Sequence, residues 1–305
     1  MKWIVPLCWF ICVQSMLSAQ IQEVPKVSSG KIVRWAQWPS AFVEARNVDI
    51  WLPPEYDANP TSTFPVLYFQ DGQNLFDASL SYGGVEWGLD EWMAKLIAEK
   101  RIKPAIVVGI WNSPKRFREY MPEEPFYTLE DSIRNALSTE RGGVPVSKQY
   151  LRFLVEELIP RVDREFRTQA NRESRFLAGS SMGGLISMYT LVKNPDLFSA
   201  AACISTHWPS SLKFNTGEIP ASIQKWMEEN IPVNPNYRMY FDHGTTQLDA
   251  WYPQWQKQVD AMLSQKKFKP GTLISKTFEG AGHNEASWNA RLDIILEFLL
   301  SQSKP

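Results

Sequence analysis

A mostly parallel α/β sheet with helices on both faces is the fold that this sequence predicts. Short apolar runs with strand character alternate with longer stretches whose apolar residues recur every three to four positions, as in βαβ units. The chain has 305 residues, of which 44% are hydrophobic and 21% are charged, so it can bury one large core. It contains no Gly/Ser-rich linker and no internal repeat, so a single domain over residues 20–305 is expected.

Residues 1–19 have the pattern of a signal peptide. Lys2 precedes an apolar run from Trp3 to Val13, and small or polar residues follow up to Ala19. The run is shorter than the roughly 20 apolar residues that a membrane-spanning helix needs. We therefore expect cleavage after Ala19 and a secreted or periplasmic location, with no membrane contact by the mature chain.

The strands follow from their apolar patterns, taken in chain order. Two segments, 31–35 and 47–52, alternate apolar and polar residues, which suggests paired antiparallel strands. The later strands are mostly continuous apolar runs, as expected of strands that are buried on both faces. They cover residues 65–69, 105–110, 176–178, 199–204, 238–241 and 273–278.

Amphipathic patterns between these strands predict the helices. In the first of them, Leu89, Trp92, Met93 and Leu96 recur at helical spacing. The predicted helices cover residues 86–99, 146–166, 182–192, 251–263 and 285–300. The irregular segment 111–143 is expected to form a loop or small cap at the carboxyl ends of the strands, where such sheets bind ligands.

The segment from Gly179 to Gly183 carries a G-x-S-x-G motif with Ser181 at its centre. The motif lies between a predicted strand and a predicted helix, where it forms a strained turn that exposes the serine hydroxyl above the sheet. The same turn places the Met182 N–H beside that hydroxyl. The motif therefore predicts a nucleophile and one donor of an oxyanion hole, and a Ser/Gly-rich helix start made for capping is the alternative.

A serine hydroxyl needs a general base, and the chain contains three histidines. His283 follows the last predicted strand and precedes the last predicted helix, which is where folds with this motif carry their base. His207 comes too soon after the motif and is expected to line a pocket or support the structure. His243 is the remaining alternative, so the sequence predicts His283 as the base.

A carboxylate must hold the imidazole in the correct tautomer, and in this chain order it follows the penultimate strand. Asp242 and Asp249 both lie there. Asp242 ends the strand and can tie the next turn by bonds to the backbone, which is a common structural role of Asp. We therefore predict Asp249 as the acid, with Asp242 as the alternative.

The loop after the third strand, residues 70–74, is expected to supply the second oxyanion donor. We predict the N–H of Gln73, with Gly72 allowing the backbone to approach the substrate. An ordinary polar turn is the alternative. A calcium loop is disfavoured because Asp71 and Asp77 lack the alternating ligand pattern. This set of residues requires neither a metal ion nor an organic cofactor.

Aromatic and basic residues near the predicted site are candidates for substrate contact. Trp111, Trp208, Trp251 and Trp288 fall near predicted loops and could stack on a sugar or phenolic ring, although each could equally be core. Arg118 could pair with an anionic substrate group or with a neighbouring Glu. The chain has 32 Lys and Arg against 33 Asp and Glu without a block of like charge, which argues against nucleic-acid binding.

A set of motifs agrees in order and spacing with a known family. They are Leu52-Pro-Pro-Glu-Tyr56, Gln70-Asp-Gly-Gln-Asn-Leu-Phe-Asp77, Arg118-Glu-Tyr120, Gly179-Ser-Ser-Met-Gly-Gly184, Gly244-Thr245 with Asp249, and Gly282-His283. Nearly all of the mature chain resembles the esterase family of α/β hydrolases that includes esterase D, feruloyl and acetyl-xylan esterases, and enterobactin esterases. The resemblance implies an α/β-hydrolase fold with Ser181, Asp249 and His283 as its triad. One departure is Asp71-Gly72, where many relatives have His-Gly.

Together these features predict a secreted serine esterase that hydrolyses carboxylic esters through an acyl-enzyme. The expected substrate is a small-molecule or oligosaccharide ester, such as an acylated carbohydrate or a siderophore lactone. One alternative is an acyltransferase that uses a sugar in place of water, as the related mycolyltransferases do. The other is a catalytically inactive hydrolase fold that binds carbohydrate, against which the complete Ser, Asp and His set argues.

Overall fold

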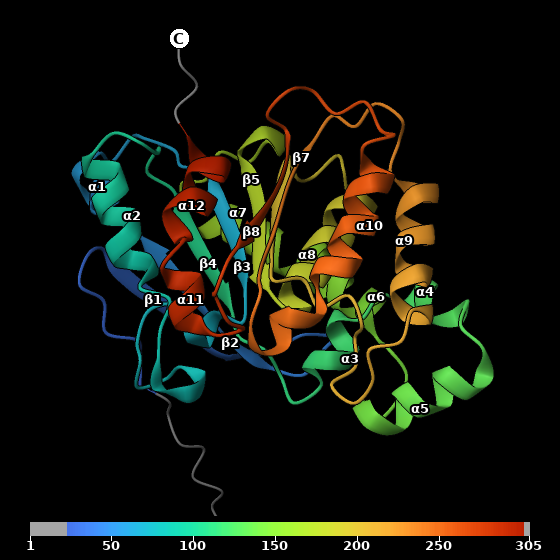
Figure 1. The fold of residues 1–305 in the computed structure, drawn as a ribbon. Helices are drawn as coiled ribbons and strands as arrows, with labels where there is room; N and C mark the ends of the chain where they lie inside the picture. The colour runs from blue at the N-terminus through green and yellow to red at the C-terminus, as the bar shows by residue number, and fades with distance from the viewer. Residues whose placement is uncertain (1–22, 302–305) are drawn as a thin grey trace, which may run out of the picture.

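The computed structural model describes residues 23–301, and the predicted signal peptide lies outside them. Its centre is an eight-stranded sheet with the strand order β1-β2-β4-β3-β5-β6-β7-β8 (Figure 1). The two pairs β1–β2 and β2–β4 are antiparallel, and all the following pairs are parallel. The predicted fold class, a mostly parallel α/β-hydrolase sheet, is confirmed.

Each predicted strand is present in the sheet. Both of the first two strands were predicted from alternating apolar and polar residues. The first lies at the edge of the sheet and is partly exposed, as that pattern predicts. The second is buried along its whole length because it lies between two other strands. The strands are β1 (Lys31–Trp38), β2 (Arg46–Leu52), β3 (Val66–Gln70), β4 (Ile106–Ile110), β5 (Arg175–Ser180), β6 (Ala200–Ile204), β7 (Arg238–Gly244) and β8 (Leu273–Phe278).

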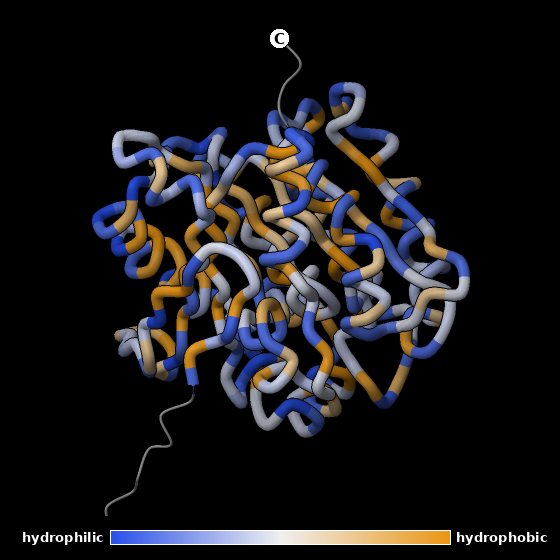
Figure 2. Tube along the Cα trace, turned by 90° about the vertical axis from the view of Figure 1, so that its left-hand side faces the viewer, coloured by the Kyte–Doolittle hydropathy of each residue, from blue (hydrophilic) through white to orange (hydrophobic). Residues whose placement is uncertain are grey.

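Two apolar layers cover the two faces of the sheet. Successive residues of a strand point to opposite faces, so in β3 Val66 and Tyr68 join one cluster while Leu67 and Phe69 join the other. Helices α2 (Leu89–Ala98), α11 (Glu285–Asn289) and α12 (Leu292–Leu300) cover one face. On the other face lie α8 (Met182–Lys193), α9 (Glu218–Asn230) and α10 (Pro253–Leu263) (Figure 1). Figure 2 shows the apolar residues concentrated along the inner strands and helix faces.

The long helix predicted over residues 146–166 is a composite. It consists of α6 (Ser147–Arg152), the π-helical segment η3 (Phe153–Leu158) and α7 (Ile159–Glu165). Pro160 explains the wide turn, because a proline has no N–H to donate and its ring collides with the carbonyl four residues earlier. The helix predicted over 285–300 is likewise divided, since Ala290 and Arg291 separate α11 from α12.

The inserted segment 111–143 is mostly helical. It forms α3 (Arg116–Tyr120), α4 (Glu123–Tyr127) and α5 (Asp131–Arg141), which lie in the lower right part of the molecule in Figure 1. The short elements η1 (Gly72–Asn74), η2 (Tyr82–Gly84), η4 (Arg172–Ser174), η5 (Gln247–Trp251) and α1 (Pro54–Ala58) complete the described part of the chain. In residues 23–301, no helix is both long enough and apolar enough to cross a bilayer.

Candidate active site

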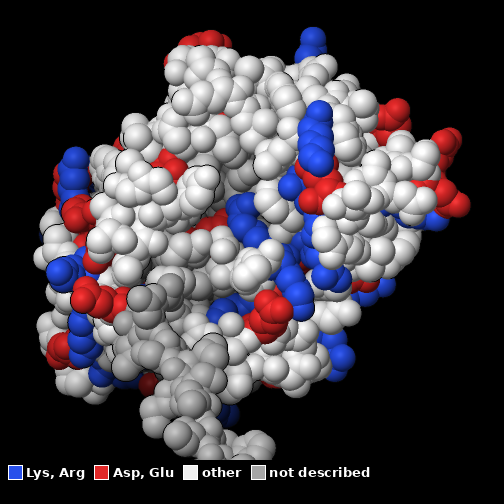
Figure 3. Space-filling model, turned by 90° about the horizontal axis from the view of Figure 1, so that it is seen from below, with Lys and Arg blue, Asp and Glu red and all other residues white. Residues whose placement is uncertain are grey.

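A cleft of about 430 Å³ opens at the edge of the sheet where the parallel strands end. Segments from distant parts of the sequence line it, including η1, the start of α3, the β5–α8 turn and the start of α11. Figure 3 views this edge of the molecule and shows both basic and acidic side chains in the central part of the face. The lining residues include Asp71, Gln73, Asn74, Tyr82, Asn112, Arg116, Phe117, Ser181, Leu212, Leu248, His283, Glu285 and Trp288.

Ser181 forms the turn between β5 and α8. Its φ of 58° and ψ of −123° lie outside the regions that L-residues usually adopt, and such strain clusters at functional sites. The flanking glycines make the turn possible, because a Cβ on Gly179 would lie 2.6 Å from the carbonyl carbon of Gly183. A Cβ on Gly183 would lie 3.1 Å from the Cβ of Gln70. The glycines of the G-x-S-x-G motif therefore allow the backbone to pack closely around Ser181.

His283 and Asp249 complete a hydrogen-bonded chain with Ser181. The Nε2 of His283 lies 3.0 Å from the Ser181 Oγ, and its Nδ1 lies 2.6 Å from the Asp249 Oδ1. An ionised carboxylate can only accept, so Nδ1 carries the proton and Nε2 is left as an acceptor for the serine hydroxyl. The structure thus brings together the three residues that the sequence predicts as catalytic.

Asp249 is held in place by more than the histidine. It is fully buried, and its Oδ2 accepts from the Ser205 Oγ at 2.7 Å and from the Gly244 N–H at 2.6 Å. Burial by itself would raise the pKa of Asp249, but the hydrogen bond from His283 and those from Ser205 and Gly244 outweigh burial and lower it. The carboxyl therefore stays ionised and can stabilise an imidazolium.

The alternative acid, Asp242, has a different partner. Its carboxylate pairs with the buried Arg291 at 2.8 Å, and it also accepts from the Ser205 N–H and from the Tyr240 hydroxyl. Burial raises the pKa of Asp242 more than the Arg291 charge lowers it. Asp242 therefore ties β7 to the helical break before α12, where Arg291 lies.

The two other histidines lie apart from the chain of bonds between Ser181 and Asp249. His243 Nδ1 lies 2.7 Å from the Gly244 carbonyl oxygen, and its Nε2 lies 3.3 Å from the Thr277 hydroxyl. His207 is fully buried, and its Nδ1 lies 2.8 Å from the Tyr252 hydroxyl. His283 is thus the histidine whose ring nitrogen contacts the Ser181 hydroxyl.

The two backbone N–H groups predicted as oxyanion donors belong to Met182, which follows Ser181 in the chain, and to Gln73, which lines the cleft. Met182 begins α8 and Gln73 lies in the first turn of η1, so neither N–H has an acceptor within its own helix. Gly72 brings η1 close to the sheet, because a Cβ at this position would lie 2.3 Å from the carbonyl carbon of Gly109. Asp71, just before η1, adopts a left-handed conformation with φ 58° and ψ 46°. This geometry suits the oxyanion roles predicted for Met182 and Gln73.

Arg116 is a site residue that the sequence did not single out. Its guanidinium donates two hydrogen bonds, of 2.7 and 2.6 Å, to the Asp71 carboxylate. The Asn112 side chain donates to the same carboxylate at 2.6 Å. These bonds hold the left-handed Asp71 and therefore the loop that carries Gln73. The sequence shows two arginines, residues 116 and 118, close together in this segment. Which of them faces the cleft depends on the rotational position of each residue around α3, and only the structure shows this.

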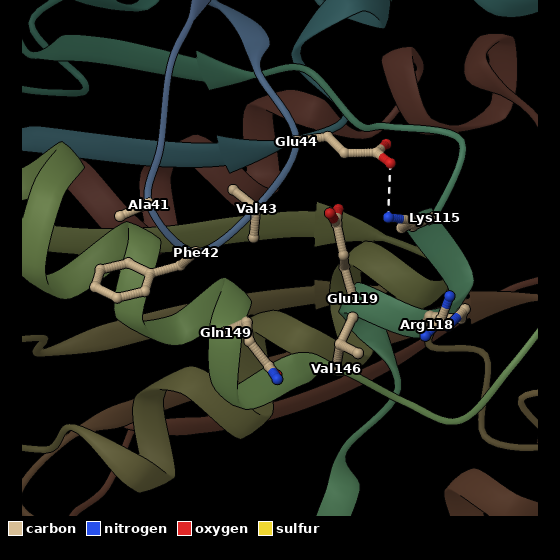
Figure 4. A pocket seen from close by; sticks show the side chains of 9 residues that line it. All are labelled: Ala41, Phe42, Val43, Glu44, Lys115, Arg118, Glu119, Val146 and Gln149. Carbon is tan, nitrogen blue, oxygen red and sulfur yellow. Dashed lines mark ion pairs between the residues drawn. The ribbon is translucent and has the colours of Figure 1, made fainter.

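Arg118 lies on the other side of α3, because two residues along a helix correspond to a rotation of about 200°. Its Nε donates to the Val144 carbonyl oxygen at 2.8 Å. The side chain lines a separate cavity of about 350 Å³ with Phe42, Glu119 and Gln149, among others (Figure 4). The predicted contact of Arg118 with the substrate is therefore corrected, and Arg116 occupies the corresponding place in the cleft.

Of the four candidate tryptophans, only Trp288 is among the described residues that line the cleft. Trp208 is fully buried and donates to Gln256 at 3.1 Å, and Trp111 is buried against Arg34 and donates to Asp49 at 2.6 Å. Trp251 is half-buried at the end of η5 and is not among the described residues that line the cleft. Buried indoles that donate to core partners cannot stack on a ligand. Trp288 does line the cleft, with its ring 5.0 Å from that of His283.

No group of three or more His, Cys, Asp or Glu side chains among residues 23–301 has the arrangement of a metal site. The carboxylates of the cleft have other partners. Asp71 is paired with Arg116, and Glu285 accepts from the Asn74 amide at 3.4 Å. Burial raises the pKa of Glu285.

Comparison with known proteins finds relatives that match much of this chain. The protein YbbA of Bacillus subtilis, which is described as uncharacterised, is 26% identical over 85% of this chain and 94% of its own length. The ferri-bacillibactin esterase BesA of Bacillus subtilis is 24% identical over 63% of this chain and 64% of its own. A ferulic acid esterase from Anaeromyces mucronatus is 19% identical, and its structure superposes with a TM-score of 0.58 over 91% of this chain and 92% of that one.

The family model described as "Putative esterase" matches residues 40–299, which is most of the chain and includes every residue of the cleft named above. The solved structure has the same fold, and one of the two relatives is an esterase by its description. The chain therefore belongs to this esterase family of α/β hydrolases, and ester hydrolysis is the activity that its membership supports.

Proposed function

We propose that the protein is a secreted serine esterase that cleaves carboxylic esters through an acyl-enzyme, with Ser181 as nucleophile, His283 as base and Asp249 as acid. One observation carries the proposal: the strained Ser181 bonds to His283, which bonds in turn to Asp249. Export rests on the predicted signal peptide of residues 1–19.

The proposed reaction has two halves. In the first, His283 takes the proton of Ser181 as the Oγ attacks the ester carbonyl, and the N–H groups of Met182 and Gln73 stabilise the oxyanion. The leaving alcohol receives the proton from His283, and the acyl group remains on Ser181. In the second half, His283 takes a proton from water, the hydroxide attacks the acyl carbon, and the proton returns to the Oγ as the acid leaves.

The lining of the cleft suits an ester that carries both a ring and polar groups. Tyr82 and Leu212 are 81% and 52% exposed at the cleft, and Trp288 lies deeper beside His283. Arg116 and Glu285 add charged groups next to these apolar surfaces. We propose an acylated carbohydrate or a siderophore ester as the substrate class, which agrees with the substrate in the name of BesA.

Active-site labelling combined with a substrate panel tests the proposal. A fluorophosphonate probe should label the wild-type protein and fail to label Ser181→Ala, while Ser180→Ala, which removes the adjacent hydroxyl, should still be labelled. Feruloyl and acetyl sugar esters, a catecholate siderophore lactone and p-nitrophenyl esters form the panel. An unlabelled wild-type protein would favour a binding module, and transfer of the acyl group to an added sugar would favour an acyltransferase.

A further inference from the structure

Two charged residues at the end of α5, Glu140 and Arg141, are almost fully buried. Their side chains are 5% and 7% exposed, and they form an ion pair of 3.0 Å. Neither belongs to the described residues that line the cleft. Burying a charge costs free energy unless the charge has partners, so the partners of this pair indicate what it does.

The Glu140 carboxylate holds the loop 205–217, which joins β6 to α9. Its Oε1 accepts from the Leu212 N–H at 2.9 Å, and its Oε2 accepts from the Ser211 Oγ at 2.7 Å. The same Ser211 oxygen accepts from the two N–H groups that follow Leu212, at 3.1 and 3.2 Å. The backbone of Leu212 and of its neighbours is therefore fastened to α5.

The position of Glu140 within α5 supports this role. Glu140 lies in the last turn of the helix, where the helix dipole disfavours a negative charge. The helix by itself would be more stable with a neutral or basic residue at this position. The bonds from Glu140 to the loop explain why an acidic residue is present there.

Arg141 holds the same loop and also contacts a second apolar residue, Phe117. The Arg141 Nη2 donates to the Ser210 carbonyl oxygen at 3.0 Å. Its guanidinium lies over the Phe117 ring, with the Cζ 3.6 Å from the ring centroid, and a cation in this position is attracted to the ring. Burial lowers the pKa of Arg141 from 12.5 to about 10, so the guanidinium stays charged at neutral pH. One ion pair thus fixes both Phe117 and the backbone of Leu212.

Phe117 and Leu212 both line the cleft that contains Ser181 and His283. Phe117 is half-buried, and Leu212 is 52% exposed although its backbone is held in place. These two side chains, which we call the apolar wall, therefore present apolar surface to the cleft at a fixed position. Ligand sites typically consist of such surfaces together with a few polar groups.

We propose that Phe117 and Leu212 determine specificity for esters with an apolar acyl or alcohol group, and that Glu140 and Arg141 are their positioning residues. The inference rests on the proposed function. When an alkyl or aryl group of the substrate packs against the apolar wall, water leaves both surfaces, and the complex is stabilised in proportion to the apolar area that is buried. A displaced wall would reduce this stabilisation for large esters, whereas esters too small to reach the wall would lose little.

The test compares kcat/KM for esters that differ in one apolar group. One series varies the acyl group of p-nitrophenyl esters from acetate to butyrate and hexanoate, and the other varies the alcohol of acetate esters from ethyl to phenyl and naphthyl. For Leu212→Ala we expect kcat/KM of the largest ester, relative to that of the smallest, to fall about tenfold in at least one series, as expected for a lost apolar contact. The series that responds shows whether the wall holds the acyl or the alcohol group. Unchanged ratios in both series would overturn the proposal.

Variants of Glu140 test the positioning role. Glu140→Ala removes the bonds to the loop but leaves both side chains of the apolar wall in the chain, and it should lower the same ratio as Leu212→Ala does. The double variant should lose no more than the larger single effect, because Glu140 acts through Leu212. Glu140→Gln keeps an oxygen that can accept from the Leu212 N–H, so it should restore part of the ratio. Fully additive effects in the double variant would contradict the positioning role.

Glu130→Ala is the matched control, because Glu130 is an exposed acidic residue just before the other end of α5. It should leave every ratio unchanged. If Glu140→Ala does not fold, Leu212→Ala and Phe117→Ala decide the question, since each shortens a partly exposed side chain of the wall. A wild-type protein that hydrolyses none of the esters would refute the proposed function. Hydrolysis by the wild type with unchanged ratios in both wall variants would refute this inference alone.

Discussion

Asp249 shows how a single side chain can determine the state of the whole site. Its two oxygens have separate tasks, since one accepts from His283 and the other from Ser205 and the Gly244 N–H. The second set of bonds prevents the carboxylate from turning away from the imidazole. The orientation of His283 therefore depends on groups that do not touch the nucleophile.

The variant Asp249→Asn tests this dependence. An amide can donate to the Nδ1 of His283, which would move the ring proton to Nε2 and remove the acceptor for Ser181. We expect kcat for p-nitrophenyl acetate to fall about 10⁴-fold, as in other triads that lose the carboxylate. The measurement is steady-state kinetics on protein whose folding has been checked by circular dichroism.

Asp242→Asn is the matched control. It breaks one side of a buried ion pair with Arg291 and should lower the free energy of unfolding by about 3–5 kcal/mol. The kcat of the folded fraction should stay within about tenfold of wild type, because Asp242 does not contact His283. An equal loss of kcat in both variants would contradict the assignment of Asp249.

At the scale of elements, the site depends on the close approach of η1 to β4. Gly72 has no room for a side chain, because the added atom would lie 2.3 Å from Gly109 backbone. Neither backbone can move far, since β4 is a central strand and η1 is held through Asp71 by Arg116. The position of the Gln73 N–H is thus set by a contact between two glycines.

Gly72→Ala should displace this donor. We expect kcat/KM to fall by about 10²- to 10³-fold, the effect of losing one oxyanion donor, and stability to fall by about 1–3 kcal/mol through overpacking. Gly217→Ala is the control, because the new Cβ would meet only Trp255, at an ordinary 3.6 Å. Kinetics and urea denaturation measure both effects, and a Gly72→Ala variant with normal kcat/KM would exclude Gln73 as a donor.

Sequence periodicity predicted the strands and the major helices well, because strands buried on both faces leave continuous apolar runs. It did not predict α9. The apolar residues of this helix, such as Ile219 and Trp226, are few and are separated by polar residues, so their pattern predicts a loop. It also could not set the phase of α3, since five residues give no measurable period. For this reason Arg118 was predicted at the cleft and Arg116 was missed.

The candidate triad could be predicted because chain order and local motifs restrict where its members lie. The tryptophan contacts could not, since a Trp near a loop may face either the core or the solvent, and only packing decides. Trp208 illustrates this, as its indole is fully buried and donates to Gln256 of α10. Site residues that directly follow a strand are thus predicted more reliably than residues whose role depends on the direction in which their side chains point.

At the scale of the whole molecule, a cluster of carboxylates near α2 makes stability depend on pH. Burial, together with the neighbouring charges of Glu91 and Asp90, raises the pKa of Glu86 from 4.5 to about 7. The folded state therefore binds a proton more tightly than the unfolded chain does. Its stabilising contribution is complete below about pH 4.5 and is lost as the pH rises through 7.

Glu86→Gln removes this titration while keeping a polar side chain of the same shape. We expect its Tm to exceed that of wild type at pH 8.5 and to match it at pH 4.5 or below, measured by differential scanning calorimetry across that range. Glu229→Gln, on the exposed end of α9, should show no such pH-dependent difference. A gain for Glu86→Gln that is the same at both pH values would contradict the raised pKa.

The cleft also brings together an early and a late segment of the described chain. The Asn74 amide donates to Glu285 across 211 positions, and the strand bridge between Ile102 and Ser301 fastens the last helix beside the first half of the fold. His283 consequently reaches Ser181 only after the final segment has docked. During refolding, turnover should reappear later than the far-ultraviolet circular dichroism signal, so that esterase activity reports the last docking event of the chain.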